Sequence, residues 1–195
     1  MTYDARTALI VVDVQNDFAD PHGSLYVNGG EHVVDDVNRE VAGAAEAGAT
    51  IVYTQDWHPP DTAHFEKDGG VWPVHCVRDT WGAELHPALD VADGAANVKK
   101  GVGGEDGYSG FTVRDPVTGD ERPTELEGLL RDAGVERVVV VGLATDYCVK
   151  ETAIDAARLR FGTTVLRGAI AAVDLERGDG DRALEEMAAA GASIA

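Results

Sequence analysis

Residues 138–152 read VVVVGLATDYCVKET, and this stretch is the clearest indication of the fold class. Four valines and a glycine form a short apolar run, which is typical of a strand buried on both faces of a parallel sheet. A polar turn follows, and we expect Cys148 in the first turn of a helix. Free backbone amides and the helix dipole favour a thiolate there, so the pattern predicts a lowered thiol pKa and a nucleophilic sulfur. Because lone cysteines are more often small buried apolar residues, this interpretation depends on the rest of the chain.

Strands and helices alternate along the remaining sequence. Apolar runs or helical spacing of apolar residues predict strands at 8–14, 50–54, 96–99, 163–166 and 192–195, and helices at 31–47, 124–133, after Cys148 and at 181–190. A strand, a helix and a second strand in this order give a right-handed crossover and parallel pairing. We therefore predict one domain over residues 1–195, a doubly wound, Rossmann-like α/β fold with about six parallel strands and helices on both faces.

Three segments lack regular periodicity. Residues 55–93 are rich in tryptophan and proline, which indicates an ordered, functional loop rather than disorder. Residues 101–110 form a glycine-rich loop, and residues 112–122 are polar and turn-like. Thr124, with Glu127 three residues later, has the pattern of a capping box at a helix start.

The composition limits the classes of partner. The chain has 16 basic and 35 acidic residues and a net charge of -19, so nucleic acids and anionic membranes would be repelled. A solvated acidic surface is the preferred interpretation, and adaptation to high salt stays open. The early apolar run is too short for a membrane span, no signal-peptide pattern occurs, and two cysteines suggest no disulfide framework. These features predict a cytoplasmic protein.

Several metal-ligating side chains gather after the second predicted strand. Asp56, His58, His64 and His75 lie within TQDWHPPDTAHF and WPVHC. A carboxylate with imidazoles suits Zn, Fe or Mn. A single loop histidine usually makes ordinary hydrogen bonds, but the cluster favours a metal site. Cys76 is a weaker ligand candidate.

Two further residues suit the chemistry of a cysteine nucleophile. Asp13, at the end of the first predicted strand, either caps a turn or acts as a general base beside the thiol. Of the adjacent Lys99 and Lys100, we expect one exposed lysine without a specific role and select Lys100 as the cation that stabilises negative charge. Strand-end positions would bring Asp13, Lys100 and Cys148 into one crevice.

The combined motifs resemble a known family over nearly the whole chain, the isochorismatase-like cysteine hydrolases, and within them the nicotinamidases or pyrazinamidases. The motifs are ALIVVDVQNDF at 8–18, DWHPPDTAHF at 56–65, WPVHC at 72–76, KG at 100–101, YSGF at 108–111 and GLATDYCV at 142–149. The resemblance implies strand order 3-2-1-4-5-6 and a catalytic set of Cys148, Asp13 and Lys100. It also implies a cis peptide between Leu143 and Ala144, and an oxyanion hole formed by the amides of Ala144 and Cys148.

By the same likeness, Asp56, His58 and His75 bind one divalent metal, with Zn placed before Fe or Mn. His64 matches a position that ligates the metal in some members and only lies nearby in others. The ring pocket would be walled by residues that match Phe18, Trp72, Tyr108 and Tyr147, the last of which stands where many relatives have histidine.

The activity implied is hydrolysis of nicotinamide to nicotinate and ammonia through a cysteine thioester, within NAD salvage, with pyrazinamide as a further substrate. The alternatives are an amidohydrolase of the same superfamily that acts on a carbamoyl or ureido amide, and a non-catalytic binding scaffold. Relatives of the first kind generally lack the metal set, and a binding module has no use for a thiol and its base. Isochorismatase itself is disfavoured because those enzymes lack the cysteine. A homo-oligomer stays open.

Overall fold

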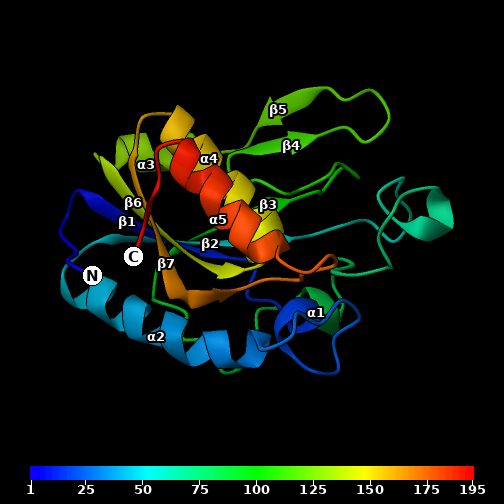
Figure 1. The fold of residues 1–195 in the computed structure, drawn as a ribbon, viewed down its shortest axis with the longest axis horizontal. Helices are drawn as coiled ribbons and strands as arrows, with labels where there is room; N and C mark the ends of the chain where they lie inside the picture. The colour runs from blue at the N-terminus through cyan, green and yellow to red at the C-terminus, as the bar shows by residue number, and fades with distance from the viewer.

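A six-stranded parallel sheet forms the centre of the computed structural model, which describes residues 1–195 (Figure 1). Its strands are β1 (Thr7–Val12), β2 (Thr50–Asp56), β3 (Ala96–Lys100), β6 (Arg137–Leu143), β7 (Gly162–Ala171) and β8 (Ser193–Ile194). The spatial order is β3-β2-β1-β6-β7-β8. Counting only these six strands along the chain gives 3-2-1-4-5-6, so the predicted topology is confirmed.

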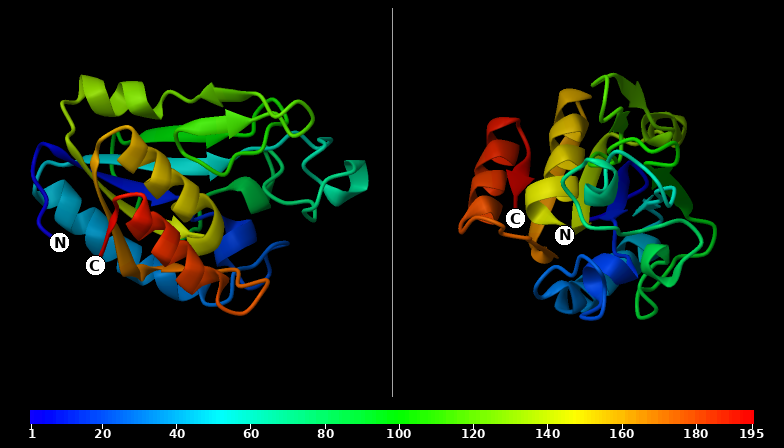
Figure 2. Two further views of the ribbon diagram at one scale, coloured as in Figure 1. Left: turned by 45° about the horizontal axis from the view of Figure 1, so that its top comes forward. Right: turned by 90° about the vertical axis from the view of Figure 1, so that its right-hand side faces the viewer.

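Helices cover both faces of this sheet, as predicted. α2 (Gly30–Glu46) packs on one face, beside the one-turn helix α1 (Asn16–Ala19). α3 (Leu126–Asp132), α4 (Lys150–Arg158) and α5 (Asp179–Ala189) pack on the other. Figures 1 and 2 show α2 on one side of the sheet and the α4–α5 pair on the opposite side.

The hydrophobic core is divided by the sheet into two clusters of 21 buried residues each. Ile10 of β1 packs into one cluster, while its neighbours Leu9 and Val11 pack into the other, because successive side chains of a strand point to opposite faces. All six residues of β1 are buried. This burial on both faces explains why the central strands are continuous apolar runs.

Several element boundaries differ from those predicted. β1 ends at Val12, two residues early, because Asp13 has a φ of 49° and a left-handed residue cannot continue a strand. Residues 112–122 are not merely turn-like: β4 (Thr112–Arg114) and β5 (Glu121–Pro123) form a small antiparallel hairpin. Strands of three residues are too short to leave a readable alternation.

The predicted capping box at Thr124 does not form. α3 begins at Leu126 with Glu125 as its N-cap, and the Thr124 hydroxyl accepts the Leu126 N–H at 3.1 Å from the residue before the cap. Glu127 does not reach back, because its carboxylate pairs with Arg131 one turn on. The Thr124 N–H instead donates to Phe111 O.

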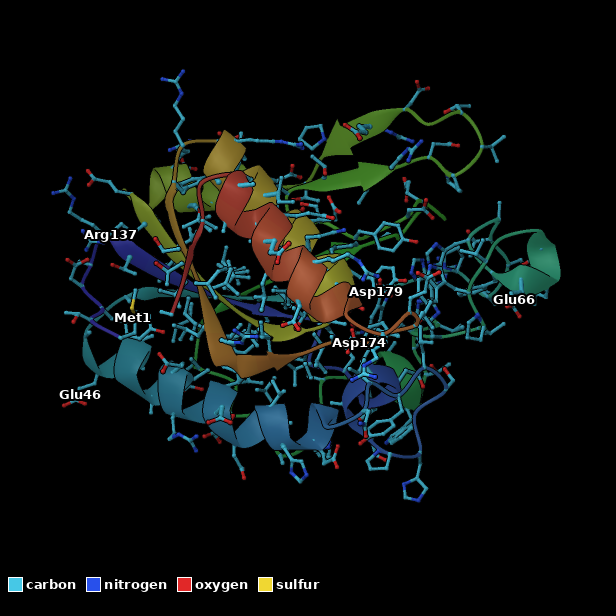
Figure 3. All side chains as sticks on the ribbon, in the orientation of Figure 1. Met1, Glu46, Glu66, Arg137, Asp174 and Asp179 are labelled. Carbon is cyan, nitrogen blue, oxygen red and sulfur yellow. The ribbon has the colours of Figure 1, made fainter.

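The carboxyl ends of the strands all face the same end of the molecule. In Figure 3 the labelled Arg137, at the start of β6, lies at the opposite end from Glu66, which stands on the long loop after β2. Between Gly142 and Val12 the central strands approach so closely that any Cβ at position 142 would clash with Val12, and Gly142 also has a φ of 109°. The long loop 57–95 contains only two short 3-10 helices, Glu66–Asp68 and Trp81–Ala83. None of the helices is both long and apolar enough to cross a membrane.

Candidate active site

Asp13, Lys100 and Cys148, here called the nucleophile half, meet at the carboxyl edge of the sheet. Asp13 follows β1, Lys100 ends β3, and Cys148 lies just beyond β6. Lys100 Nζ lies 2.7 Å from Asp13 Oδ2, and both side chains are fully buried. The Cys148 sulfur and carboxylate oxygens of Asp13 and Asp56 all lie within 4.8 Å of one another. The structure therefore brings together the three residues that the sequence grouped.

The turn that carries Cys148 is a single turn of π-helix, Thr145–Val149, rather than the first turn of an α-helix. The Val149 N–H donates to Ala144 O, five residues back, and α4 begins only at Lys150. Such π turns are frequent at functional sites. The peptide bond between Leu143 and Ala144 is cis, as predicted. The Ala144 N–H donates to no group of the protein, and Ala144 and Cys148 both line the pocket described below.

The Lys100 ammonium holds the site together electrostatically. It donates to Asp13 Oδ2, to Asp56 Oδ1 at 2.8 Å, and to the Gly107 carbonyl. Burial alone would lower the pKa of Lys100, but the two carboxylates raise it well above its usual range. Lys100 is therefore a permanent cation in this site, whereas Lys99 lies over the Trp57 ring, 3.3 Å from its centroid.

The expected lowering of the Cys148 pKa is wrong. Burial raises the pKa of the Cys148 thiol well above its usual range, and Asp13 adds to this effect while Lys100 opposes it. Burial disfavours the charged form of a thiol, and one helix terminus does not compensate. The resting residue is a thiol, so a base must remove its proton when it reacts.

Asp13 lies next to the thiol, with a carboxylate oxygen within 4.8 Å of the Cys148 sulfur. Burial raises the pKa of Asp13, and the nearby Asp56 carboxylate raises it further, although Lys100 and the Thr54 hydroxyl lower it. Thr54 Oγ1 donates to Asp13 Oδ1 at 2.6 Å, which fixes the carboxylate. A raised pKa makes a carboxylate a stronger base than one in water. The left-handed backbone of Asp13 is uncommon for a residue other than glycine and occurs often at functional positions.

His58, His64 and His75, here called the imidazole half, lie beside this set. One ring nitrogen of each lies within 4.8 Å of the others, and all three side chains are buried. Asp56 Oδ2 lies 3.8 Å from His58 Nε2 and 4.0 Å from His75 Nε2. Burial would raise the pKa of Asp56, but Lys100 and His58 lower it below its usual range, so this carboxylate is ionised. Burial lowers the pKa of His75 to about 4, so its imidazole is neutral at pH 7.

The hydrogen bonds of the imidazoles fit a metal site. His75 Nδ1 lies 2.7 Å from the Pro73 carbonyl, and His64 Nδ1 lies 2.5 Å from Asp106 Oδ1. Both partners accept only, so each Nδ1 carries the hydrogen and each Nε2 is free to ligate. Both ring nitrogens of the fully buried His58 have no hydrogen-bond partner. A buried polar atom without a partner is unfavourable, and a cation at this position would satisfy it.

Three imidazole nitrogens and a carboxylate oxygen suit Zn²⁺, Fe²⁺ or Mn²⁺. The predicted ligands His58 and His75 thus lie close both to Asp56, within 4.0 Å, and to His64, within 4.8 Å. Gly101 packs against the His58 ring so closely that a Cβ there would clash with it, and its φ of 70° also favours glycine.

An aromatic pocket opens onto both halves. Phe18, Trp72, Tyr108 and Tyr147 all line it, as the sequence predicted. Trp72 Nε1 donates to the Tyr108 hydroxyl at 2.7 Å, and the Trp72 and Tyr147 rings meet edge to face with centroids 4.9 Å apart. Nine of the 13 lining residues are hydrophobic: the full set is Phe18, Leu25, Val27, Asp56, His64, Trp72, His75, Gly107, Tyr108, Ala144, Tyr147, Cys148 and Val173. A mostly apolar, aromatic wall with a few polar groups suits a flat ring.

The sequence did not reveal the residues that hold the ligands in place. Gln15 accepts the Asp56 N–H and donates to the Asp56 carbonyl, both at 2.8 Å. Asp17 accepts the Cys76 N–H at 2.7 Å, next to His75. Gln15 and Asp17 do lie in the QNDF segment after β1, and their position at a strand end was the signal available. The pocket residues Leu25 and Val27 lie in an irregular segment without any signal.

The fold and this geometry define an α/β protein whose sheet edge carries a buried thiol, carboxylate and ammonium beside an imidazole cluster. Residues 7–195 match the isochorismatase domain family, and the chain belongs to this family. Among curated relatives, it is 40% identical over 192 residues to the nicotinamidase/pyrazinamidase of Mycobacterium tuberculosis, covering 96% of this chain and 97% of that protein.

Solved structures agree with this assignment. The pyrazinamidase of Pyrococcus horikoshii in complex with zinc superposes with a TM-score of 0.87 at 40% identity, over 97% of this chain and 98% of that one. PnC1 of L. infantum in complex with nicotinate gives a TM-score of 0.90 at 36% identity, over 100% and 95% of the two chains.

Proposed function

We propose that this protein is an amidohydrolase that converts nicotinamide to nicotinate and ammonia through a thioester on Cys148, and that it also deamidates pyrazinamide. The observation that carries the proposal is the position of Cys148 and Asp13 beside an aromatic pocket that is also lined by His64 and His75. The likeness to nicotinamidases with nicotinate or zinc bound supports this choice of substrate. Release of nicotinate would place the reaction in NAD salvage.

In the first half-reaction, Asp13 takes the proton of the Cys148 thiol as the sulfur attacks the carboxamide carbon. The oxygen of that carbonyl becomes negative, and the N–H groups of Ala144 and Cys148 receive it. Asp13 then gives its proton to the amide nitrogen, and the C–N bond breaks. Ammonia departs, and the acyl group stays on Cys148 as a thioester. Lys100 stays protonated and stabilises each negatively charged state.

In the second half-reaction, water attacks the thioester carbon and Asp13 takes a proton from it. The C–S bond breaks and the Cys148 sulfur recovers a proton, so nicotinate leaves and the protein returns to its starting state. One carboxylate thus serves as base and acid in turn, as in other nucleophilic mechanisms with a covalent intermediate.

His58, His64, His75 and Asp56 would hold the metal, with Zn²⁺ as the first choice and Fe²⁺ or Mn²⁺ as alternatives. When bound, the cation would supply a Lewis acid for the pyridine nitrogen, directly or through water. Phe18 and Trp72 then enclose the ring, which leaves the carboxamide as the only part of the substrate that can reach the thiol.

One assay tests the proposed activity. Metal-stripped protein is incubated with nicotinamide or pyrazinamide, and ammonia is measured before and after addition of Zn²⁺, Mn²⁺ or Fe²⁺. We expect release to rise when one of these ions is restored. Absence of ammonia under every ion would contradict the proposal and favour an amidohydrolase for carbamoyl or ureido amides.

The remaining predictions go with this proposal. Residues 1–195 would act as one hydrolase domain in the cytoplasm, on a small aromatic amide and without nucleic acid or membrane as partner. The net charge of -19 supports the part of this proposal that concerns nucleic acids and anionic membranes, since both would be repelled. Assembly of identical chains into a homo-oligomer is compatible with this proposed activity.

A further inference from the structure

His64 lies in the irregular loop after β2, whereas Asp56 ends that strand. The His58 backbone donates its N–H to Cys76 O at 3.0 Å, and its carbonyl accepts the Arg78 N–H at 2.9 Å. The corresponding bonds of His64 are longer: its N–H donates to the Thr62 hydroxyl at 3.2 Å, and its carbonyl accepts the Trp72 N–H at 3.4 Å. The orientation of the His64 ring therefore depends on its side-chain contacts.

Asp106 is the group that contacts it. Its carboxylate accepts from His64 Nδ1 at 2.5 Å, across 42 residues of sequence. The Asp106 side chain is 19% exposed and that of His64 is 4% exposed, so water competes little for this bond. The partners of the other two imidazoles are weaker: a backbone carbonyl for His75 and none for His58.

The backbone of Asp106 is held in turn by the β4–β5 hairpin. Its N–H and carbonyl form a pair of hydrogen bonds with Arg114 of β4, at 2.7 and 3.0 Å. Its neighbour Glu105 lies 3.7 Å from Arg122 of β5, and Thr62 donates to Gly104 O at 2.7 Å. The β4–β5 hairpin and the glycine-rich loop therefore form the support on which the Asp106 carboxylate rests.

We infer that Asp106 is a positioning residue for the metal site: it fixes His64 as the Nδ1–H tautomer and directs Nε2 toward His58 and His75, which makes His64 a ligand. A carboxylate in this position also makes the imidazole a stronger donor to a cation. The inference rests on the proposed metal site and assigns a function to the β4–β5 hairpin, which otherwise lies outside the catalytic chemistry.

The test is the Zn²⁺ dissociation constant of the purified full chain, measured by competition with a chromophoric chelator at one pH and ionic strength. Loss of such an outer carboxylate typically weakens metal binding about 10–100-fold. We expect this loss for Asp106→Ala and a smaller loss for Asp106→Asn, because an amide oxygen still accepts from Nδ1–H. The control is Asp61→Asn, which removes a carboxylate charge from the loop that carries His64; the Asp61 side chain is 86% exposed and contacts Lys67 rather than an imidazole, so the constant should change less than about threefold.

A double-mutant cycle separates positioning from a general structural effect. If Asp106 acts through His64, then Asp106→Ala should change the Zn²⁺ constant less than about threefold once His64→Ala is present. Equal losses in both backgrounds would overturn the inference, as would wild-type affinity in Asp106→Ala. Should Asp106→Ala fail to fold, the same cycle with Asp106→Asn decides.

The result is independent of the proposed activity. A wild-type chain that hydrolyses nicotinamide and binds Zn²⁺, with Asp106→Ala binding equally well, leaves the amidase proposal intact and removes Asp106 from the metal site. A wild-type chain that binds no Zn²⁺ overturns the inference, while the ammonia assay still decides the reaction.

Discussion

The nucleophile half and the imidazole half of the site are built in opposite ways. Asp13, Lys100 and Cys148 lie at, or within five residues of, the ends of three strands of the main sheet. The imidazoles stand on a loop, two, eight and nineteen residues beyond Asp56 at the end of β2. The first half is positioned by the hydrophobic core beneath it, whereas the second depends on polar contacts between loops.

The two halves should therefore tolerate the loss of different interactions. Strand ends are held by packed apolar side chains, so removing one functional group there should leave the geometry intact. The three imidazoles pack against the buried Phe65 ring, but they lie outside the hydrogen-bonded strands, and the orientation of a ring such as His64 depends on a single hydrogen bond with Asp106. The predictions below test this contrast, beginning with the largest effect.

Cys148→Ala should lower kcat for nicotinamide at least about 10⁴-fold, because no other group can form the thioester. Zn²⁺ binding and nicotinamide binding should persist, since the turn is held by the core. Calorimetry on the variant and a continuous ammonia assay make this measurement.

The matched control is Cys76→Ala, which removes the second buried thiol but keeps the backbone N–H that Asp17 accepts. It should retain turnover within about fivefold of wild type. Turnover in Cys148→Ala within tenfold of wild type would exclude that sulfur as the nucleophile.

Lys100→Met should lower the free energy of unfolding by about 3–5 kcal/mol, since it leaves the Asp13 and Asp56 carboxylates buried without a cation. Lys67 provides a close control, because its ammonium also contacts two carboxylates, at 2.6 and 2.7 Å, but is 41% exposed. Lys67→Met should cost at most about 1 kcal/mol. Urea denaturation of both variants gives the two free energies of unfolding. Equal losses of this free energy would show that burial does not determine how much these ion pairs stabilise the protein.

Removal of the metal should affect the imidazole half alone. At free Zn²⁺ one hundred times its dissociation constant, binding stabilises a folded chain by about 2.7 kcal/mol. Amide hydrogen exchange should therefore quicken over residues 57–76 and 101–107 after chelation, while β1 and β6 keep their protection. Faster exchange throughout the central strands would mean that the metal supports the whole fold, and the contrast between the two halves would then be wrong.

Tyr108→Phe should raise the KM for nicotinamide about fivefold with kcat within twofold of wild type. The change removes the oxygen that accepts the Trp72 N–H, and one such bond contributes about 1 kcal/mol. Tyr53→Phe also deletes a bonded hydroxyl, one that contacts Asp90 and Ala92 away from the pocket, and should leave KM unchanged. A KM shift in both variants would point to a general loss of stability instead of a pocket effect.

The nucleophile half was the easier part to predict from the sequence. Continuous apolar runs fix the strands and their parallel pairing, and the rule that carboxyl ends share one edge then brings Asp13 and Lys100 to Cys148. What the pattern could not give is the pKa of Cys148, because burial by residues from other elements, not the local helix, dominates it.

The supports of the imidazole half had no comparable signal. Metal-ligand residue types are visible in DWHPPDTAHF, but the bond from His64 to Asp106 joins two loops without periodicity, and the β4–β5 strands are too short to be read. The missing bond between the Glu127 carboxylate and the Thr124 N–H has a similar cause. The carboxylate pairs with Arg131, and the N–H donates to Phe111 O. Local patterns predict which elements form, while side-chain partners across loops are set by the assembled structure.

The ammonium of Lys100, shared between Asp13 and Asp56, also bears on how such a protein can evolve. Any substitution that removes the charge of Asp13 or Asp56 changes the electrostatic environment of the other, so the proposed base and the proposed metal ligand are not independent of each other. We expect new amide substrates to be acquired through the ring walls, Phe18, Trp72, Tyr108 and Tyr147, whose exchange leaves that charge balance untouched. We therefore expect the charged centre to tolerate substitution least and the aromatic walls to tolerate it most.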